Sequence, residues 1–335
     1  MLHSWLDRWD ESKARRGDAS KAPADFALDA ERAFPAAPQA PDIAAFNKLS
    51  DRAARDPAFF DPSPGPTEGV ESEDGWIAFN SSLPSGVERN DTVRAKVTEA
   101  RGSDHALIVF HHWNARARKP RLARYFVRRG ITVVEIALPF HLERSRPGAI
   151  HANDILSSNL GRTLGSMRQA VLDGRQLVAI LRGQGYGKIS VLGMSLGSWV
   201  AGLVAAHDEA VERAALFLAA GSLADMVWTG RATRHIRTSL EGRIDPTALR
   251  RAWRPLDLGH HVDKLARPGL KLLIVLAERD TVVRPSLSEE LVTKLDAAGG
   301  RPEVMRLNCG HYSLSLPPYV FRAGRGALGL LKGLP

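Results

Sequence analysis

The sequence contains one cysteine, Cys309, so the chain forms no internal disulfide bond and offers no thiolate cage for a metal ion. Its longest mainly apolar stretches, residues 131–140 and 270–277, are far shorter than the ~20 residues that a membrane-spanning helix needs, and each contains a charged residue. Residues 1–13 lack the apolar core of a signal peptide. We therefore expect a cytoplasmic protein without a transmembrane segment.

The composition is ordinary for a folded protein: of 335 residues, 44% are hydrophobic and 25% are charged. This length allows one large α/β domain with appendages, or two modest domains. The formal net charge of +9 suggests an anionic partner, but the basic residues are dispersed along the chain. Their densest group, at residues 116–129, is interpreted either as an anion-attracting patch or as a solvated helix face, and we expect no nucleic-acid partner.

The N-terminal segment predicts a helical extension followed by a linker. Its apolar residues Leu2, Trp5, Leu6 and Trp9 recur at helical spacing and would form one stripe beside charged residues. The stripe either docks on the rest of the chain or makes a peripheral contact with a membrane or a partner. Residues 61–69, Asp-Pro-Ser-Pro-Gly-Pro-Thr-Glu-Gly, contain too many helix and strand breakers for a regular element.

From residue 75 onward, apolar strands alternate with helical segments. We expect strands at 76–83, 93–100, 105–111, 131–138, 188–192, 214–219, 270–276 and 303–307, the first two as an antiparallel pair, and helices at 121–129, 155–182, 196–207 and 286–298. This alternation is typical of a mostly parallel sheet with helices on both faces. Residues 1–74 are then an extension with a linker, residues 75–335 an α/β domain, and residues 222–263 an Arg-rich, partly helical insert.

Residues 193–197 read Gly-Met-Ser-Leu-Gly, a G-x-S-x-G sequence between a predicted strand and a predicted helix. A nucleophile on such a turn has a strained backbone, and the flanking positions must lack side chains so that the strand and the helix can approach closely. The hydroxyl of Ser195 would then project near the start of the next helix, where free N–H groups can stabilise an oxyanion. The alternative is a glycine-rich packing turn, but the position between a strand and a helix favours the nucleophile.

A serine hydroxyl needs a base to remove its proton, and that base needs an acid to hold its tautomer. Asp280 and His311 each follow a predicted strand in the second half of the chain. The order Ser195, Asp280, His311 therefore predicts a nucleophile, an acid and a base, with Glu278 as the close competitor of Asp280. The alternatives are a surface carboxylate paired with a neighbouring arginine for Asp280, and a capping or core histidine for His311.

With these motifs, residues 75–335 resemble the α/β-hydrolase superfamily of serine hydrolases and esterases. The resemblance implies an α/β-hydrolase fold, with the insert at 222–263 as a substrate-covering cap after the sixth strand, here preceded by the N-terminal helical extension. In such proteins one oxyanion donor comes from a His-Gly-X turn after the third strand. The resemblance therefore assigns the two donors to the backbone N–H groups of Trp113 and Leu196. His112 stands where glycine is usual, which departs from the family's pattern.

Three further side chains are predicted to contact the substrate: His112, His141 and Met194. For His141 the alternative is a hydrogen bond that stabilises its loop. The adjacent His111 and His112 do not predict a metal site, because neighbouring strand residues point to opposite faces and no partner ligand is evident at metal spacing. We expect neither a metal nor another cofactor.

These residues together predict a serine hydrolase that cleaves a carboxylic ester or thioester, from a small molecule or a lipid, through an acyl-enzyme intermediate. Two alternatives stay open. One is a catalytically inactive binding protein on the same fold, and the other is a lipid acyl hydrolase drawn to anionic membranes. The sequence makes no prediction about the oligomeric state.

Overall fold

The computed structural model describes residues 2–36, 40–62 and 70–334. Within them, one sheet has the strand order β1-β2-β3-β5-β4-β6-β7-β8-β9. The strands are β1 (Glu71–Glu73), β2 (Trp76–Asn80), β3 (Thr92–Thr98), β4 (His105–Phe110), β5 (Thr132–Ile136), β6 (Lys188–Met194), β7 (Val211–Phe217), β8 (Lys271–Ala277) and β9 (Glu303–Leu307). The neighbouring pairs β1–β2, β2–β3 and β3–β5 are antiparallel. The pairs β5–β4, β4–β6, β6–β7, β7–β8 and β8–β9 are parallel, which confirms the mostly parallel sheet.

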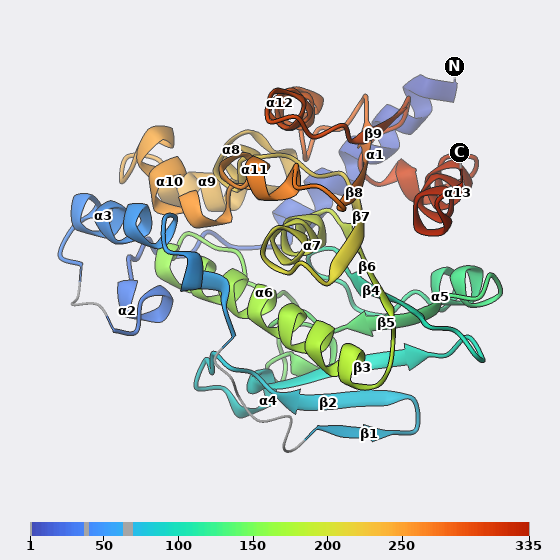
Figure 1. The fold of residues 1–335 in the computed structure, drawn as a ribbon. Coiled ribbons are helices and arrows are strands. Elements are labelled where there is room, and N and C mark those ends of the chain that lie inside the picture. The colour runs from blue at the N-terminus through green and yellow to red at the C-terminus, as the bar shows by residue number, and fades with distance from the viewer. Residues whose placement is uncertain (1, 37–39, 63–69, 335) are drawn as a thin grey trace.

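Helices cover both faces of this sheet (Figure 1). They are α1 (Leu2–Ala19), α2 (Ala30–Ala33), α3 (Ile43–Ala53), α4 (Glu88–Asp91), α5 (Pro120–Val127), α6 (Leu160–Gly183), α7 (Leu196–His207), α8 (Leu223–Thr229), α9 (Arg234–Leu240), α10 (Pro246–Ala252), α11 (Val262–Leu265), α12 (Pro285–Ala297) and α13 (Tyr319–Lys332). Alternate residues of β4 join two apolar clusters. Ile108 and Phe110 pack with α6 and α7, whereas Leu107 and Val109 pack with α5 and α13.

Every predicted strand and helix has a counterpart, with ends that move by a few residues. The helix expected from residue 155 begins at Leu160, because the side chain of Asn159 caps it by accepting the N–H of Arg162 at 2.9 Å. Outside the extension and the insert, one strand and two α-helices were not predicted: the short strand β1, the helix α4 and the helix α13. The helix α13 was not predicted because its glycines lower its helical propensity. One of them, Gly326, lies against β9, where a Cβ would be 2.5 Å from Cε of Met305.

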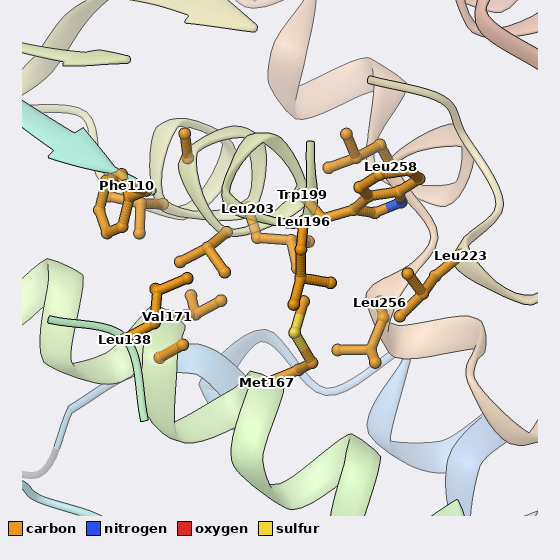
Figure 2. Packing of buried hydrophobic residues seen from close by; sticks show 14 of the residues in the cluster. Phe110, Leu138, Met167, Val171, Leu196, Trp199, Leu203, Leu223, Leu256 and Leu258 are labelled. Atoms are coloured by element: carbon orange, nitrogen blue, oxygen red, sulfur yellow. The ribbon is translucent and has the colours of Figure 1, made fainter. Parts of the chain in front are cut away.

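The insert between β7 and β8 consists of α8 to α11 and three short 3-10 turns. Figure 2 shows that its residues Leu223, Leu256 and Leu258 lie beside Trp199 of α7, and all four side chains are buried. The insert is therefore anchored in the main core, on the same side of the sheet as α7.

The N-terminal extension forms α1, α2 and α3. Of the predicted apolar stripe, Leu6 is buried, whereas Trp5 is 50% exposed and stacks on Trp9 with ring centroids 6.4 Å apart. The side chain of Leu2 and most of the predicted linker lie outside the described residues. None of the described helices combines the length and the hydropathy that crossing a membrane requires.

Candidate active site

The turn from β6 into α7 places Ser195 in a strained backbone conformation, with φ 52° and ψ −122°. Glycines flank it for steric reasons. A Cβ at Gly193 would lie 2.3 Å from the carbonyl oxygen of Gly197, and a Cβ at Gly197 would lie 2.3 Å from that of Phe110. The close approach of strand and helix predicted from the G-x-S-x-G sequence is therefore present.

Three polar side chains form one hydrogen-bonded series at the carboxyl ends of the parallel strands. Nε2 of His311 lies 3.1 Å from Oγ of Ser195, and its Nδ1 lies 2.7 Å from Oδ2 of Asp280. Asp280 is 4% exposed, and its other oxygen accepts the backbone N–H groups of Val282 and Val283 at 2.7 and 2.8 Å. The structure thus brings together the three residues that the sequence nominated, and hydrogen bonds hold both oxygens of the carboxylate.

The alternatives considered for these positions do not match their surroundings. Glu278 is exposed, whereas Asp280 is buried and bound to His311. The neighbouring Arg279 forms its ion pair with Asp7 instead of Asp280. Cys309 is fully buried, and burial raises the pKa of its thiol to about 12, so it stays protonated and unreactive.

The backbone N–H groups of Trp113 and Leu196 find no acceptor among the described residues. Leu196 is the first residue of α7, where N–H groups have no partner within the helix. A Cβ at Gly197 would also lie 2.4 Å from the carbonyl oxygen of His111, so the start of α7 touches the end of β4. The two N–H groups therefore lie on adjoining segments, as an oxyanion-binding pair requires.

His112, which stands where the family usually has glycine, does not have a positive φ. In this turn the positive φ falls on Asn114, at 57°, and asparagine tolerates that conformation better than most residues. The side-chain Oδ1 of Asn114 accepts the N–H of Ala152 at 2.8 Å, and the indole N–H of Trp113 donates to the Ala152 carbonyl at 3.0 Å. The turn thus accommodates a histidine without needing a glycine.

His141 lies in the loop-stabilising position that was the alternative to substrate contact. It is 2% exposed, its Nε2 accepts the N–H of Asn114 at 2.9 Å, and its Nδ1–H donates to the carbonyl of Pro139 at 2.9 Å. Both ring nitrogens are therefore occupied. Burial, above all, lowers the pKa of His141 to about 4, so the imidazole is neutral near pH 7.

His111, directly after β4, also binds backbone groups through both of its ring nitrogens. Its Nε2 accepts the N–H of Leu138 at 3.1 Å, so its Nδ1–H donates to the carbonyl of His112 at 2.9 Å. The rings of His111 and His141 meet edge to face, with centroids 4.8 Å apart. Burial lowers the pKa of His111 far below its usual value. Together the two neutral imidazoles join the loop after β4 to the loop after β5. This role was one of the alternatives for His141 in the sequence, but it was not predicted for His111.

His112 and Met194 lie beside the Ser195–His311 pair. Burial, above all, together with the charges of Lys119 and His311 lowers the pKa of His112 to about 4, so the ring is neutral near pH 7. Met194 directly precedes Ser195 and is half-buried against the α5–α13 cluster. Their contact with a substrate stays a prediction. Within the described part of the chain, no three His, Cys, Asp or Glu side chains gather as metal ligands.

Helix α1 forms an ion pair and hydrogen bonds beside Asp280 and His311, and these contacts were not predicted from the sequence. Its Asp7 pairs with Arg279, next to Asp280. Its Asp10 accepts the backbone N–H groups of Tyr312 and Ser313, directly after His311.

The same face of α1 also contacts the insert. Glu11 pairs with Arg231, and Oδ1 of Asp18 lies 2.7 Å from Nδ1 of His235 in α9. The sequence does place Glu11, Asp18, Asp7 and Asp10 on one helical face, which is a signal for such contacts. Acidic residues on a helix usually face solvent, however, so the pattern alone did not predict them.

Trp113 is enclosed by the same segments. The amine of Lys21, two residues after the end of α1, lies 3.7 Å from the centroid of its ring, and His235 stacks on it with centroids 6.0 Å apart. Lys21 is 9% exposed, and burial lowers the pKa of its amine to about 8. The residue that supplies one candidate oxyanion donor is therefore in contact with both the extension and the insert.

Two surface cavities lie where α1 meets the insert. One, of about 470 Å³, is lined by Lys21 and His235, and the other, of about 600 Å³, is lined by Glu11, Trp228 and the Asp280 loop. Both are also lined by Arg234 and Arg237 of α9. Neither is lined by Ser195 or His311, so neither of these basic cavities contains the Ser–His pair.

No protein-family model matches the chain, and no curated protein matches its sequence. Among solved structures, an acylaminoacyl peptidase from Pyrococcus horikoshii is 13% identical with a TM-score of 0.60, over 78% of this chain and 42% of that one. An acetyl xylan esterase from a Paenibacillus species is 13% identical with a TM-score of 0.63, over 91% and 99%. A second acetyl xylan esterase, from a Thermoanaerobacterium species, is 16% identical with a TM-score of 0.60, over 96% and 97%.

The chain thus spans about two fifths of the peptidase and nearly the whole length of the esterases. At such low identity the likeness concerns the fold alone. The sheet order, the helices on both faces and these neighbours together show that the chain has the α/β-hydrolase fold.

Proposed function

We propose that the protein is a serine hydrolase that cleaves carboxylic esters or thioesters through an acyl-enzyme intermediate. The observation that carries this proposal is the series Ser195–His311–Asp280, with the serine on a strained turn and both histidine nitrogens at hydrogen-bond distance. The structural likeness to two acetyl xylan esterases over nearly their full length supports ester cleavage in particular.

In the proposed reaction, Oγ of Ser195 bonds to the carbonyl carbon while Nε2 of His311 takes the hydroxyl proton. Asp280 keeps the other proton on Nδ1 and stabilises the imidazolium that forms. The N–H groups of Trp113 and Leu196 bind the developing oxyanion. The bond from the carbon to the leaving oxygen or sulfur then breaks, and His311 returns its proton to the leaving group. Water repeats the sequence on the acyl-enzyme and releases the acid.

The test is the rate at which a fluorophosphonate probe labels the purified protein, with Ser195→Ala as the control. Labelling of the parent alone, followed by hydrolysis of short-chain esters that the variant slows by several orders of magnitude, supports the proposal. The matched control is Ser103→Ala, which lies before β4 at the amino ends of the parallel strands, away from the site, and should keep labelling. A parent that neither reacts with the probe nor hydrolyses esters contradicts the proposal and favours the inactive binding protein.

The same experiment distinguishes ester cleavage from the cleavage of thioesters, amides and lipids. A panel of acetyl to decanoyl esters, the matching thioesters and an aminoacyl amide compares the substrate classes directly. Faster cleavage of the amide than of the esters would contradict the ester assignment and favour a peptidase. Activity confined to anionic vesicles and lost at high salt would favour the lipid acyl hydrolase.

A further inference from the structure

The loop that carries His311 is bound by a carboxylate from the other end of the chain. Oδ1 of Asp10 accepts the N–H of Tyr312 at 2.6 Å and that of Ser313 at 3.1 Å. These donors open the 3-10 turn Ser313–Ser315, where N–H groups have no partner within the turn. Asp10 therefore caps this turn from α1, and the capped turn begins two residues after His311.

The loop is shaped to receive this carboxylate. Gly310, directly before His311, is the residue whose Cβ would lie 2.5 Å from Cγ of Asp10 and 2.6 Å from its Oδ2. A side chain at this position would displace either the loop or α1. The backbone on both sides of His311 is thus in contact with the same side chain.

Asp10 is 4% exposed, and its Oδ2 has no hydrogen-bond partner among the described residues. A buried carboxylate with one unsatisfied oxygen is costly, and a merely solubilising residue would lie on the exposed face of the helix. Other contacts set α1 in place. Leu6 and Ala14 are buried on the same helix, and Glu11 pairs with Arg231 of the insert.

We infer that Asp10 is a positioning residue for His311, so that helix α1 is a component of the active site. The inference rests on the proposed serine-hydrolase function. Asp10 touches neither the substrate nor the reacting atoms. By binding the N–H groups after His311, it sets the distance from Nε2 to Oγ of Ser195 and the approach of Nδ1 to Asp280. Misplacement of a catalytic group by about 1 Å can lower a rate about 100-fold.

The first test compares Asp10→Ala with Asp51→Ala. Asp51 is also a carboxylate of the extension, and it pairs with Arg251 at 2.7 Å and with Arg254 at 3.3 Å, both in the insert. We expect Asp10→Ala to lower kcat and the rate of fluorophosphonate labelling about 10- to 100-fold with little change in KM. Asp51→Ala should leave both rates unchanged, and each variant should lower Tm by a few degrees.

Asp10→Asn distinguishes positioning from general stability. Its amide oxygen can still accept both N–H groups, so kcat and the labelling rate should stay within about threefold of the parent. If Asp10→Ala is too unstable to assay, Asp10→Glu provides the graded case: it keeps the acceptor but shifts it by one methylene, and should lower kcat more than Asp10→Asn does.

Two results would overturn the inference while leaving the proposed function intact. One is a parent that labels normally beside an Asp10→Ala variant that labels at the same rate. The other is a loss of activity in Asp10→Ala that Asp51→Ala shows equally at the same change in Tm, because that loss reflects stability alone. Failure of the parent to label contradicts the proposed function itself, and is therefore distinguishable.

Discussion

Oγ of Ser195 and Nε2 of His311 lie 3.1 Å apart, yet the backbone around each residue is held by a different part of the chain. Around Ser195 the contacts are local to the sheet, with Gly193 against Gly197 and Gly197 against the end of β4. Around His311 they come from α1, where Asp10 binds the two N–H groups that follow. The position of the proposed nucleophile thus depends on close packing of neighbouring backbone, whereas that of the proposed base depends on the docking of a separate helix.

This difference predicts two kinds of sensitivity. Substitutions beside Ser195 should act through steric overlap with backbone that cannot move, and should damage stability and activity together. Substitutions on α1 should act through hydrogen bonds, and their effects should depend on how well each contact is shielded from water.

The largest of these effects is expected for Gly197→Ala. The added Cβ would lie 2.3 Å from the carbonyl oxygen of Phe110 and 2.4 Å from that of His111, and would separate the start of α7 from the turn that carries Trp113. We expect fluorophosphonate labelling to slow about 100-fold, with a lower Tm. Gly183→Ala is the control, because a Cβ at Gly183 meets nothing within 4 Å. Labelling of Gly197→Ala within threefold of the parent would contradict the comparison.

A smaller effect is expected for Asp7→Ala, which removes the contact of α1 with the Asp280 loop. The side chains of Asp7 and Arg279 are 40% and 36% exposed, and ion pairs so open to water contribute about 0–1 kcal/mol. We expect kcat to change less than about threefold, measured beside Asp10→Ala at the same salt concentration. A loss as large as that from Asp10→Ala would show that α1 acts through its whole acidic face rather than through its buried carboxylate.

The smallest effect on activity, but a distinct one on stability, is expected for His141→Gln. The pKa of His141 is about 4 when folded and about 6.5 when unfolded, so the unfolded chain binds more protons between these values. The stability due to neutral His141 is complete above pH 6.5 and is lost as the pH falls towards 4.

The measurement is denaturant unfolding of both proteins at pH 7 and pH 5. The parent should lose about 2 kcal/mol more than His141→Gln between these values. The other histidines with lowered pKa values are present in both proteins, and the difference includes any change in His111, whose ring contacts that of His141. An identical loss in parent and variant would show that His141 is not held neutral by its two backbone partners.

The parts of the site that could be predicted from the sequence are those in which the signal is local. Ser195 lies between two glycines at a strand-to-helix boundary, and Asp280 and His311 follow apolar strands, so position along the chain implied position in space. The division at residue 74 remains a prediction, although β1 before it pairs with β2 after it in one sheet.

The remainder depended on contacts that no local pattern reveals. His141 reads as a polar loop residue, and only the fold shows that Asn114 and Pro139 occupy both of its nitrogens. Asp10 reads as part of a solvated helix face, since its partners lie about 300 residues away. The apolar stripe on α1 indicated Trp5 as a contact residue, but Trp5 is half exposed, and the acidic side of the helix makes the contacts instead.

The bond between Asp10 and Tyr312 spans 302 positions of the chain, and this has a consequence for the order of events during biosynthesis. Asp10 leaves the ribosome 302 residues before Tyr312, so the contact forms only after the whole segment between them has been made. Closing so long a loop is also entropically unfavourable until the sheet between its ends has assembled. The reactivity of Ser195 is therefore expected to emerge late in folding, once α1 has docked on the loop that follows His311.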